Sequence, residues 1–237
     1  LFEEQISLAY PNFDEKRVKK LAQENARYLI SVFTPATVME YTVTFGQLNY
    51  IINWAKDFIA NNYSDTFSLK LKDVFSDFLN ALPDLAVDGL DSKLKNRSFS
   101  LFAQRKSRYE EFGENYCTTY LASFAQLAQA QRHRTLSYEF SLLDVPQFYI
   151  PPIIRNTELE KVWLDDISSL ANYFPQGMLV QVNERGTIEN FVLKCTERLC
   201  GSAQLEIMEQ THNTLLKYLE ATKNKPELYD YLLPYSK

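Results

Sequence analysis

Residues 178–207 read MLVQVNERGTIENFVLKCTERLCGSAQLEI, and this stretch decides the fold class. Its first part, MLVQVN at 178–183, predicts a strand. From residue 187 to residue 222 apolar side chains recur at helical spacing, which predicts one long amphipathic helix. The buried stripe of this helix is expected to contain Ile188, Phe191, Val192, Cys195, Leu199, Ala203 and Ile207. A strand followed by such a helix indicates a mixed α+β fold.

Segments outside this stretch also show clear patterns. The spacing of apolar residues predicts helices at 14–30, 48–59, 66–82, 123–134 and 158–173. Strands are predicted at 37–45, which is rich in β-branched and aromatic residues, and at 115–122. The polar stretch from Pro83 to Asn96 is a candidate linker. Cys195 and Cys200, on the long predicted helix, are expected to be small core residues.

Two regions repeat the same order of predicted elements. Residues 16–59 run helix, Ala-Arg-Tyr, strand and helix, and residues 158–207 run helix, Ala-Asn-Tyr, strand and helix. The pattern alone is equally compatible with chance. If it reflects duplication, regions 12–80 and 158–222 should superpose about a pseudo-twofold axis.

Composition limits the classes of function. The chain has 237 residues, of which 46% are hydrophobic, so it can bury a substantial core. The net charge of −5 argues against a broad nucleic-acid-binding face, so an anionic ligand would need a local cationic pocket. No apolar run is long enough to span a membrane, and we expect a cytoplasmic protein. Three cysteines without metal-ligand spacing predict neither a disulfide framework nor a metal site. The start at Leu1, without Met, suggests a fragment of a longer chain.

Two features indicate recognition of an anion. Arg132-His133-Arg134 follows a predicted helix, where guanidinium groups can hold phosphate oxygens in a bidentate manner. The alternative is a solvated basic patch that complements the helix dipole. Arg198 lies at the edge of the predicted buried stripe, where an unpaired charge would be costly. It therefore needs a ligand or an ion pair with a neighbouring Glu.

Several motifs, in one order, resemble those of the flavin-dependent thymidylate synthases. Arg-His-Arg at 132–134 is followed by a short spacer and Ser141, and Gln129 lies three residues before the motif. Downstream come Phe148-Tyr149-Ile150-Pro151, then Arg198, then Ala203-Gln204-Leu205-Glu206-Ile207. The resemblance covers about the last half of the chain. It implies two half-repeats of helix, strand and helix around an antiparallel sheet.

The resemblance divides the chain into a degenerate partial copy at 1–85, a linker and entry segment at 86–111, and a nucleotide- and flavin-binding domain at 112–237. It also implies that dUMP becomes dTMP, with FAD as the redox cofactor, methylenetetrahydrofolate as carbon donor and NADPH as reductant. In this family the sites are shared between subunits, so we expect a homo-oligomer or a pseudo-dimer of the two copies.

The site residues are assigned from their positions in the matching motifs, except Arg27, which the first copy keeps in Ala-Arg-Tyr where the second copy has Asn172 and which could complete a site shared between the copies. Arg198 is the expected catalytic residue, which would stabilise charge developing on the pyrimidine. The expected substrate-binding residues are Gln129, Arg132, Ser141, Arg198 and Arg27. The expected cofactor-binding residues are His133, Arg134, Asn183 and Arg185. No metal ligands are expected.

The chain also departs from the family pattern. Ser141 is followed by Leu142-Leu143-Asp144, where the family has an Arg-Tyr pair, so one phosphate contact is missing or comes from elsewhere. In the first copy, the equivalents of Asn183 and Arg185 are Thr44 and Gly46. Two alternatives therefore stay open. One is a divergent pyrimidine-nucleotide C5 methylase or hydroxymethylase, and the other is a non-catalytic nucleotide-binding scaffold.

Overall fold

The computed structural model describes residues 1–36, 40–82, 85–90, 115–200 and 203–236. The chain forms two compact units, one of Leu1–Thr34 with Ser98–Lys237 and one of Pro35–Arg97. This division differs from the predicted one, because residues 1–34 belong with the C-terminal part rather than with the rest of 1–85. Most of the predicted linker, residues 91–111, lies outside the described residues.

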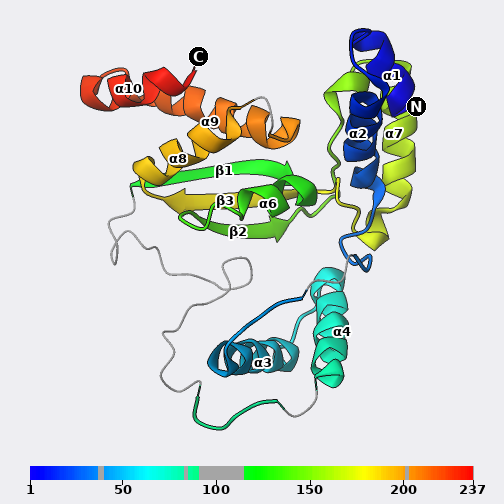
Figure 1. The fold of residues 1–237 in the computed structure, drawn as a ribbon, viewed down its shortest axis with the longest axis vertical. Coiled ribbons are helices and arrows are strands. Elements are labelled where there is room, and N and C mark those ends of the chain that lie inside the picture. Colours follow the sequence, from blue (N-terminus) through cyan, green and yellow to red (C-terminus); the bar gives the residue numbers. More distant parts are fainter. Residues whose placement is uncertain (37–39, 83–84, 91–114, 201–202, 237) are drawn as a thin grey trace. The chain divides into compact units, whose positions relative to one another are not determined.

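The first unit contains an antiparallel sheet of three strands within the described residues. The strands are β1 (Tyr116–Ser123), β2 (Ser137–Leu142) and β3 (Leu179–Gly186), in the order β1-β3-β2 (Figure 1). The predicted strands at 115–122 and 178–183 are confirmed as β1 and β3. Strand β2 was not predicted, although its residues directly follow the Arg-His-Arg motif. The structure therefore confirms a mixed α+β fold with an antiparallel sheet.

Helices cover one face of this sheet. After β3 come α8 (Ile188–Arg198) and α9 (Leu205–Thr222), then α10 (Pro226–Leu232) and the 3-10 turn η4 (Leu233–Ser236). On α8, Phe191 stacks on Tyr116 of β1 with ring centroids 4.5 Å apart. The prediction of one helix over 187–222 is wrong, since α8 ends at Arg198 and Gly201, a poor helix former, follows in the sequence. Cys195 is buried as predicted, but Cys200 lies beyond the end of α8 and is exposed.

The N-terminal helices pack against a second group of helices in the same unit. They are α1 (Phe2–Ala9), α2 (Glu15–Ala26) and the 3-10 turn η1 (Arg27–Leu29). The other side consists of α6 (Phe124–Ala130), η2 (Pro152–Ile154), α7 (Glu158–Ser169) and η3 (Ala171–Tyr173). Their shared core contains Phe2, Ile6, Val18, Ala22, Tyr28, Ala125, Ile154, Trp163 and Ile167. Backbone hydrogen bonds also join the two sides, from Gly177 N to Tyr28 O (2.8 Å) and from Gln176 N to Ile30 O (2.7 Å).

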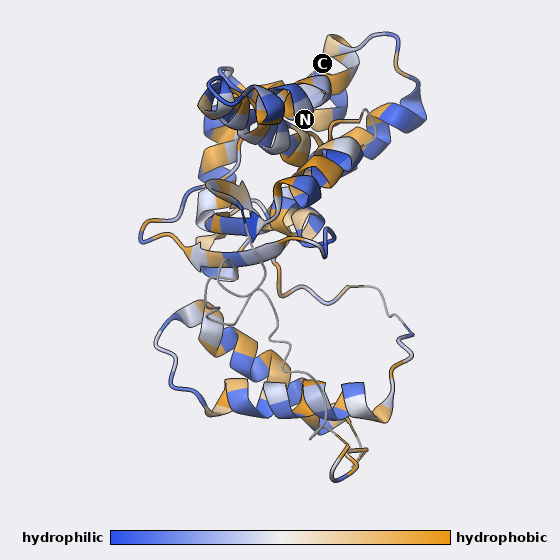
Figure 2. Ribbon diagram, turned by 90° about the vertical axis from the view of Figure 1, so that its left-hand side faces the viewer, coloured by the Kyte–Doolittle hydropathy of each residue, from blue (hydrophilic) through white to orange (hydrophobic). Residues whose placement is uncertain are grey.

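The second unit contains α3 (Phe45–Ala60) and α4 (Thr66–Ala81). Figure 2 shows apolar and polar residues alternating along these helices, as in amphipathic helices. Trp54, Phe58 and Phe75 pack where the two helices meet. Asn49 holds the backbone of Val87, accepting from its N–H (3.0 Å) and donating to its carbonyl oxygen.

The predicted strand at 37–45 is not found in its described part, residues 40–44. Residues 37–39 lie outside the described residues. Thr44 instead caps α3, since it accepts from Gln47 N and its backbone N–H donates to the Gln47 side chain. This capping box starts a helix where the pattern had suggested a strand. The described part of the first region therefore lacks the strand that the predicted helix-strand-helix repeat requires.

We expect Gly177→Ala to destabilise the first unit. A Cβ at this position would lie 2.7 Å from Ile167 Cδ1, 3.1 Å from Tyr28 Cβ and 3.2 Å from Tyr28 O. Overpacking of this kind typically costs about 1–3 kcal/mol. Urea unfolding would measure the loss. Gly186→Ala serves as the comparison, because its closest neighbour is the terminal methyl Cδ2 of Leu136, which has more freedom to move. An unchanged unfolding midpoint for Gly177→Ala would contradict the close approach of residues 28 and 177.

Candidate functional site

The Arg-His-Arg motif lies in a tight turn after α6. His133 N donates to Ala130 O (2.9 Å), and Leu136 N donates to His133 O (3.0 Å). The turn leaves Arg132 and Arg134 exposed, whereas His133 points inward and is 5% exposed. Asn190 of α8 donates from Nδ2 to Thr135 O (3.1 Å) and attaches the turn to the helix. The motif therefore presents two cations to solvent and one imidazole to the interior.

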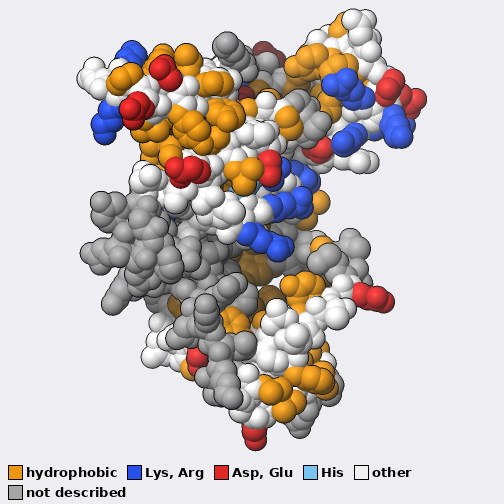
Figure 3. Space-filling model, turned by 60° about the vertical axis from the view of Figure 1, so that its left-hand side comes forward, with side chains coloured by type: hydrophobic (Ala, Val, Ile, Leu, Met, Phe, Trp, Pro, Cys, Tyr) orange, Lys and Arg blue, Asp and Glu red, His pale blue; other side chains and the backbone are white. Residues whose placement is uncertain are grey.

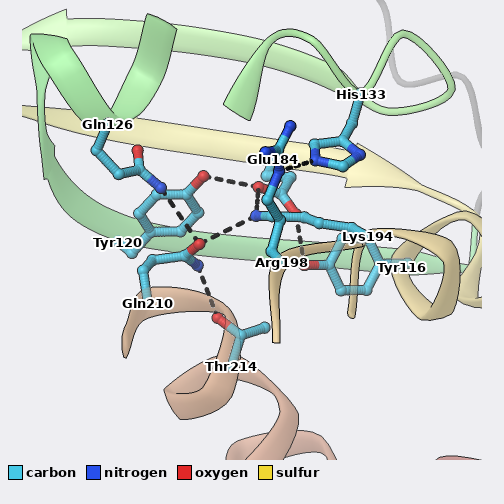
Figure 4. Close-up of polar contacts among 9 residues, drawn as sticks. All are labelled: Tyr116, Tyr120, Gln126, His133, Glu184, Lys194, Arg198, Gln210 and Thr214. Atoms are coloured by element: carbon cyan, nitrogen blue, oxygen red, sulfur yellow. Dashed lines mark hydrogen bonds and ion pairs between the residues drawn. The ribbon is translucent and has the colours of Figure 1, made fainter. Parts of the chain in front are cut away.

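The imidazole of His133 contacts Arg198, which lies 65 residues further along the chain. Arg198 Nε donates to His133 Nε2 at 2.6 Å (Figure 4). On the other side of the ring, His133 Nδ1 lies 3.3 Å from Glu197 Oε2. Burial, helped by the nearby Arg198 charge and opposed by Glu197, lowers the pKa of His133 from 6.5 to about 4. The ring is therefore neutral at pH 7. The structure thus brings together two residues that the sequence motifs had singled out separately.

A fully buried ion pair lies next to this contact. Lys194 Nζ of α8 is 2.7 Å from Glu184 Oε2 of β3, and both side chains are 0% exposed. Glu184 also accepts from Tyr116 OH (2.8 Å) and Tyr120 OH (2.6 Å), while Lys194 donates to Gln210 Oε1 (3.0 Å). Figure 4 shows these groups converging from β1, β3, α8 and α9. Each buried charge is thereby compensated by an opposite charge and by hydrogen bonds.

Sequence reasoning missed this network. The signal was present, because Glu184 follows Val180 and Val182 on the same side of β3, and alternate residues of a strand share one face. Lys194 lies three residues after Phe191 and therefore on the same side of α8. A Glu and a Lys that both fall on apolar faces predict a buried pair.

Strand β2 contributes a tyrosine to the same side of the sheet. Tyr138 pairs with Glu184 in the β2–β3 register and is 1% exposed. Its hydroxyl is buried and forms no hydrogen bond with any described residue. Burial and the Glu184 charge raise its pKa, and Arg198 acts in the opposite direction. Tyr138 therefore lies within electrostatic range of both Glu184 and Arg198.

The opposite face of the sheet carries other predicted site residues. Asn183 and Arg185 alternate with the buried Val182 and Glu184, so their side chains leave β3 on the other side. Ser141 of β2 is paired with Gln181 of β3 and shares this face. Thr119 Oγ1 donates to Asn183 Oδ1 (2.7 Å).

Arg185, which shares this face with Asn183, has an unpaired side-chain atom. Its Nε is buried and forms no hydrogen bond within the described part of the chain. The predicted site residues thus form two groups, one around Arg198 and His133 and one around Asn183, Arg185 and Ser141. Gln129 is half-buried near the end of α6 and belongs to neither group by any hydrogen bond in the described structure.

Arg27 directly precedes Tyr28 in the sequence. Tyr28 belongs to a junction of hydrogen bonds around the buried Glu206 carboxylate. Tyr28 OH donates to Glu206 Oε2 (2.9 Å), and Ser123 donates to the same carboxylate from N (2.8 Å) and Oγ (2.6 Å). Gln204 Nε2 donates to Tyr28 OH (2.7 Å). Burial raises the pKa of Glu206, although the donors from Tyr28 and Ser123 lower it in part. Among the described residues the half-buried Arg27 has no hydrogen bond to the Arg-His-Arg motif or to Arg198, and its Nε has no partner.

Cationic charge is local on this acidic protein. Figure 3 shows the Lys and Arg side chains of this view in several separate groups. Within the described residues no group of three His, Cys, Asp or Glu side chains could hold a metal ion. No described helix combines the length and the apolar character needed to cross a membrane.

No protein-family model matches the chain, and no curated protein is similar to it at a significant level.

Lys194→Met should destabilise the protein by about 3–5 kcal/mol, because Glu184 would keep a buried charge without a counter-ion. Urea unfolding would measure this loss. The double variant Glu184→Gln with Lys194→Met should recover most of it, since no buried charge then remains. Lys19→Ala is the control, because Lys19 pairs with Glu15 at the surface and its loss should leave the midpoint unchanged. Equal losses in the single and double variants would show that the charges themselves are not responsible.

Proposed function

We propose that this chain is a flavin-dependent enzyme of pyrimidine nucleotide metabolism, which in its simplest form methylates dUMP to dTMP. Methylenetetrahydrofolate would donate the carbon, and NADPH would be the reductant. The observation that carries the proposal is the 2.6 Å contact between Arg198 and His133. It joins two of the motifs on which the resemblance to flavin-dependent thymidylate synthases rests.

The contact with His133 leaves the end of the Arg198 guanidinium available to bind a ligand. Arg198 gives only its Nε–H to His133, and Nη1 and Nη2 form no hydrogen bond with any described residue. The planar end of the guanidinium can therefore donate hydrogen bonds to two oxygen atoms, or to the carbonyl edge of a pyrimidine. A fixed positive charge at that edge would stabilise negative charge that develops during attack on the carbon donor. Arg198 is accordingly the proposed catalytic residue.

The nucleotide phosphate requires a second cation. Arg132 is exposed in the turn directly before His133, and Gln129 lies half-buried one turn of helix earlier. These two residues suit a phosphate bound beside the Arg198 site. The exposed Ser141 lies on the other face of the sheet, so within one chain it is separated from Arg198.

The residues on the face of Asn183 and Arg185 suit an anionic dinucleotide such as FAD. Arg185 offers a buried Nε–H without a partner among the described residues, Asn183 lies beside it, and Arg134 is exposed on the turn. Bound FAD would supply the hydride chemistry, and the protein would bind and orient it. The two groups of site residues lie on opposite faces of one sheet, which supports a homo-oligomer in which another copy completes each site.

The decisive experiment is anaerobic. The protein is loaded with FAD, photoreduced and mixed with dUMP and methylenetetrahydrofolate, and the nucleotides are analysed. We expect dTMP. Recovery of unchanged dUMP from a flavin-loaded protein would contradict the methylase proposal.

Arg198→Ala should weaken dUMP binding about 10- to 150-fold, because a hydrogen bond to a charged group contributes about 1.5–3 kcal/mol. Arg198→Lys should restore binding only in part, since the planar fork is lost. Calorimetric titration would measure the affinities, and the FAD content should stay nearly constant as a control. Binding of dUMP by Arg198→Ala as tight as that of the parent protein would place the nucleotide elsewhere.

Arg134→Ala should lower FAD content, because it removes an exposed cation that we assign to the cofactor site. The flavin absorption band of the purified variant would report the loss. Arg17→Ala is a matched control, since it removes an exposed arginine from α2 in the same unit. Equal flavin content in both variants would remove Arg134 from the cofactor site.

A further inference from the structure

We propose that His133 and Glu197 act as positioning residues that hold the Arg198 guanidinium in a single orientation for its ligand. This inference deepens the proposed function and rests on it for the identity of the ligand. It differs from the role that the family resemblance implies for His133, which is direct contact with the flavin. The structure assigns each of the three groups a distinct task.

The position of His133 favours this role over direct contact with a ligand. Its side chain is 3% exposed, and both ring nitrogens already face protein groups. Nε2 receives the Nε–H of Arg198, and Nδ1 faces the Glu197 carboxylate. A ligand would have to displace one of these groups to reach the ring.

Glu197 selects the tautomer that the contact requires. Arg198 is always a donor, so Nε2 of His133 must be unprotonated in order to accept. The proton of the neutral ring must then be on Nδ1, which lies 3.3 Å from Glu197 Oε2 and faces its negative charge. A carboxylate behind an imidazole commonly fixes its tautomer and ring orientation in this manner.

The electrostatic surroundings keep the ring neutral. Arg198 and Lys194 of α8 disfavour its protonation, whereas Glu197 of α8 and Glu184 of β3 favour it. Burial is the largest influence and lowers the pKa to about 4. A neutral His133 accepts from Arg198 near pH 7, while a protonated one would repel it.

The contact with His133 determines from which side a ligand can approach Arg198. The guanidinium has a side edge, which includes Nε, and an end edge formed by Nη1 and Nη2. His133 occupies the side edge, so a ligand must approach the end edge. Because the side chain is held before binding, less conformational entropy is lost when the ligand binds.

Two amide substitutions at His133 distinguish the role of Nε2 from that of Nδ1. In His133→Gln the amide oxygen reaches about as far as Nε2 and can still accept from Arg198. In His133→Asn the amide reaches only as far as Nδ1 and can face Glu197 alone. We expect His133→Gln to keep dUMP affinity within a few fold of the parent, and His133→Asn to lose about 10- to 150-fold.

NMR spectroscopy provides a readout that needs no ligand. Long-range ¹H–¹⁵N spectra at pH 7 should show His133 with a protonated Nδ1 and an unprotonated Nε2, and Glu197→Ala should convert it to a mixture of tautomers. Glu197→Gln should retain the tautomer, because the amide oxygen can still accept. The other histidine, His212, is exposed on α9, and His212→Gln serves as the control for resonance assignment.

The outcomes separate this inference from the proposed function. A protonated Nε2 in the parent protein, or equal dUMP affinity in His133→Gln and His133→Asn, would overturn the positioning role. If the parent binds no dUMP but shows the expected tautomer and its response to Glu197→Ala, the positioning of Arg198 is supported and the proposed substrate is wrong.

Discussion

Glu184 and Lys194 face each other at 2.7 Å in a place where neither is exposed to solvent. A buried charge without its partner is strongly destabilising, so β3 and α8 must keep one register relative to each other. Tyr116 and Tyr120 of β1 and Gln210 of α9 bind the same pair. One charge pair thereby constrains two strands and two helices. The position of Arg198 depends on it, because Arg198 lies one turn after Lys194 on α8.

Local patterns in the sequence identified most elements of the fold but not their grouping. The predicted helices at 14–30, 48–59, 66–82 and 158–173 and the strands at 115–122 and 178–183 all correspond to observed elements. Residues 40–44 were misassigned because the capping box of Thr44 and Gln47 outweighs their β propensity. The packing of residues 1–34 with α6 and α7 depends on contacts such as Phe2 with Trp163, which no local pattern reveals.

The sequence could predict individual residues of the candidate site but not how they are arranged. The motifs singled out His133 and Arg198, but a separation of 65 residues gives no indication that Arg198 donates to the imidazole. The division of the site residues between two faces follows from strand alternation, which places Asn183 opposite to Glu184. The face on which Ser141 lies depends on the register between β2 and β3, and β2 had not been recognised from the sequence.

The junction at Glu206 determines which parts of the chain can be separated. Tyr28, from the first 34 residues, supplies one of three donors to this buried carboxylate of α9. A fragment trimmed to the C-terminal half would lose that donor, and it would expose Ile154, Trp163 and Ile167 where α1 and α2 had covered them. The first unit is therefore discontinuous in sequence, and Pro35–Arg97 is an insertion within it. Excision of that insertion removes one complete pair of helices, whereas shortening the chain from its N-terminus cuts into the core of the other unit.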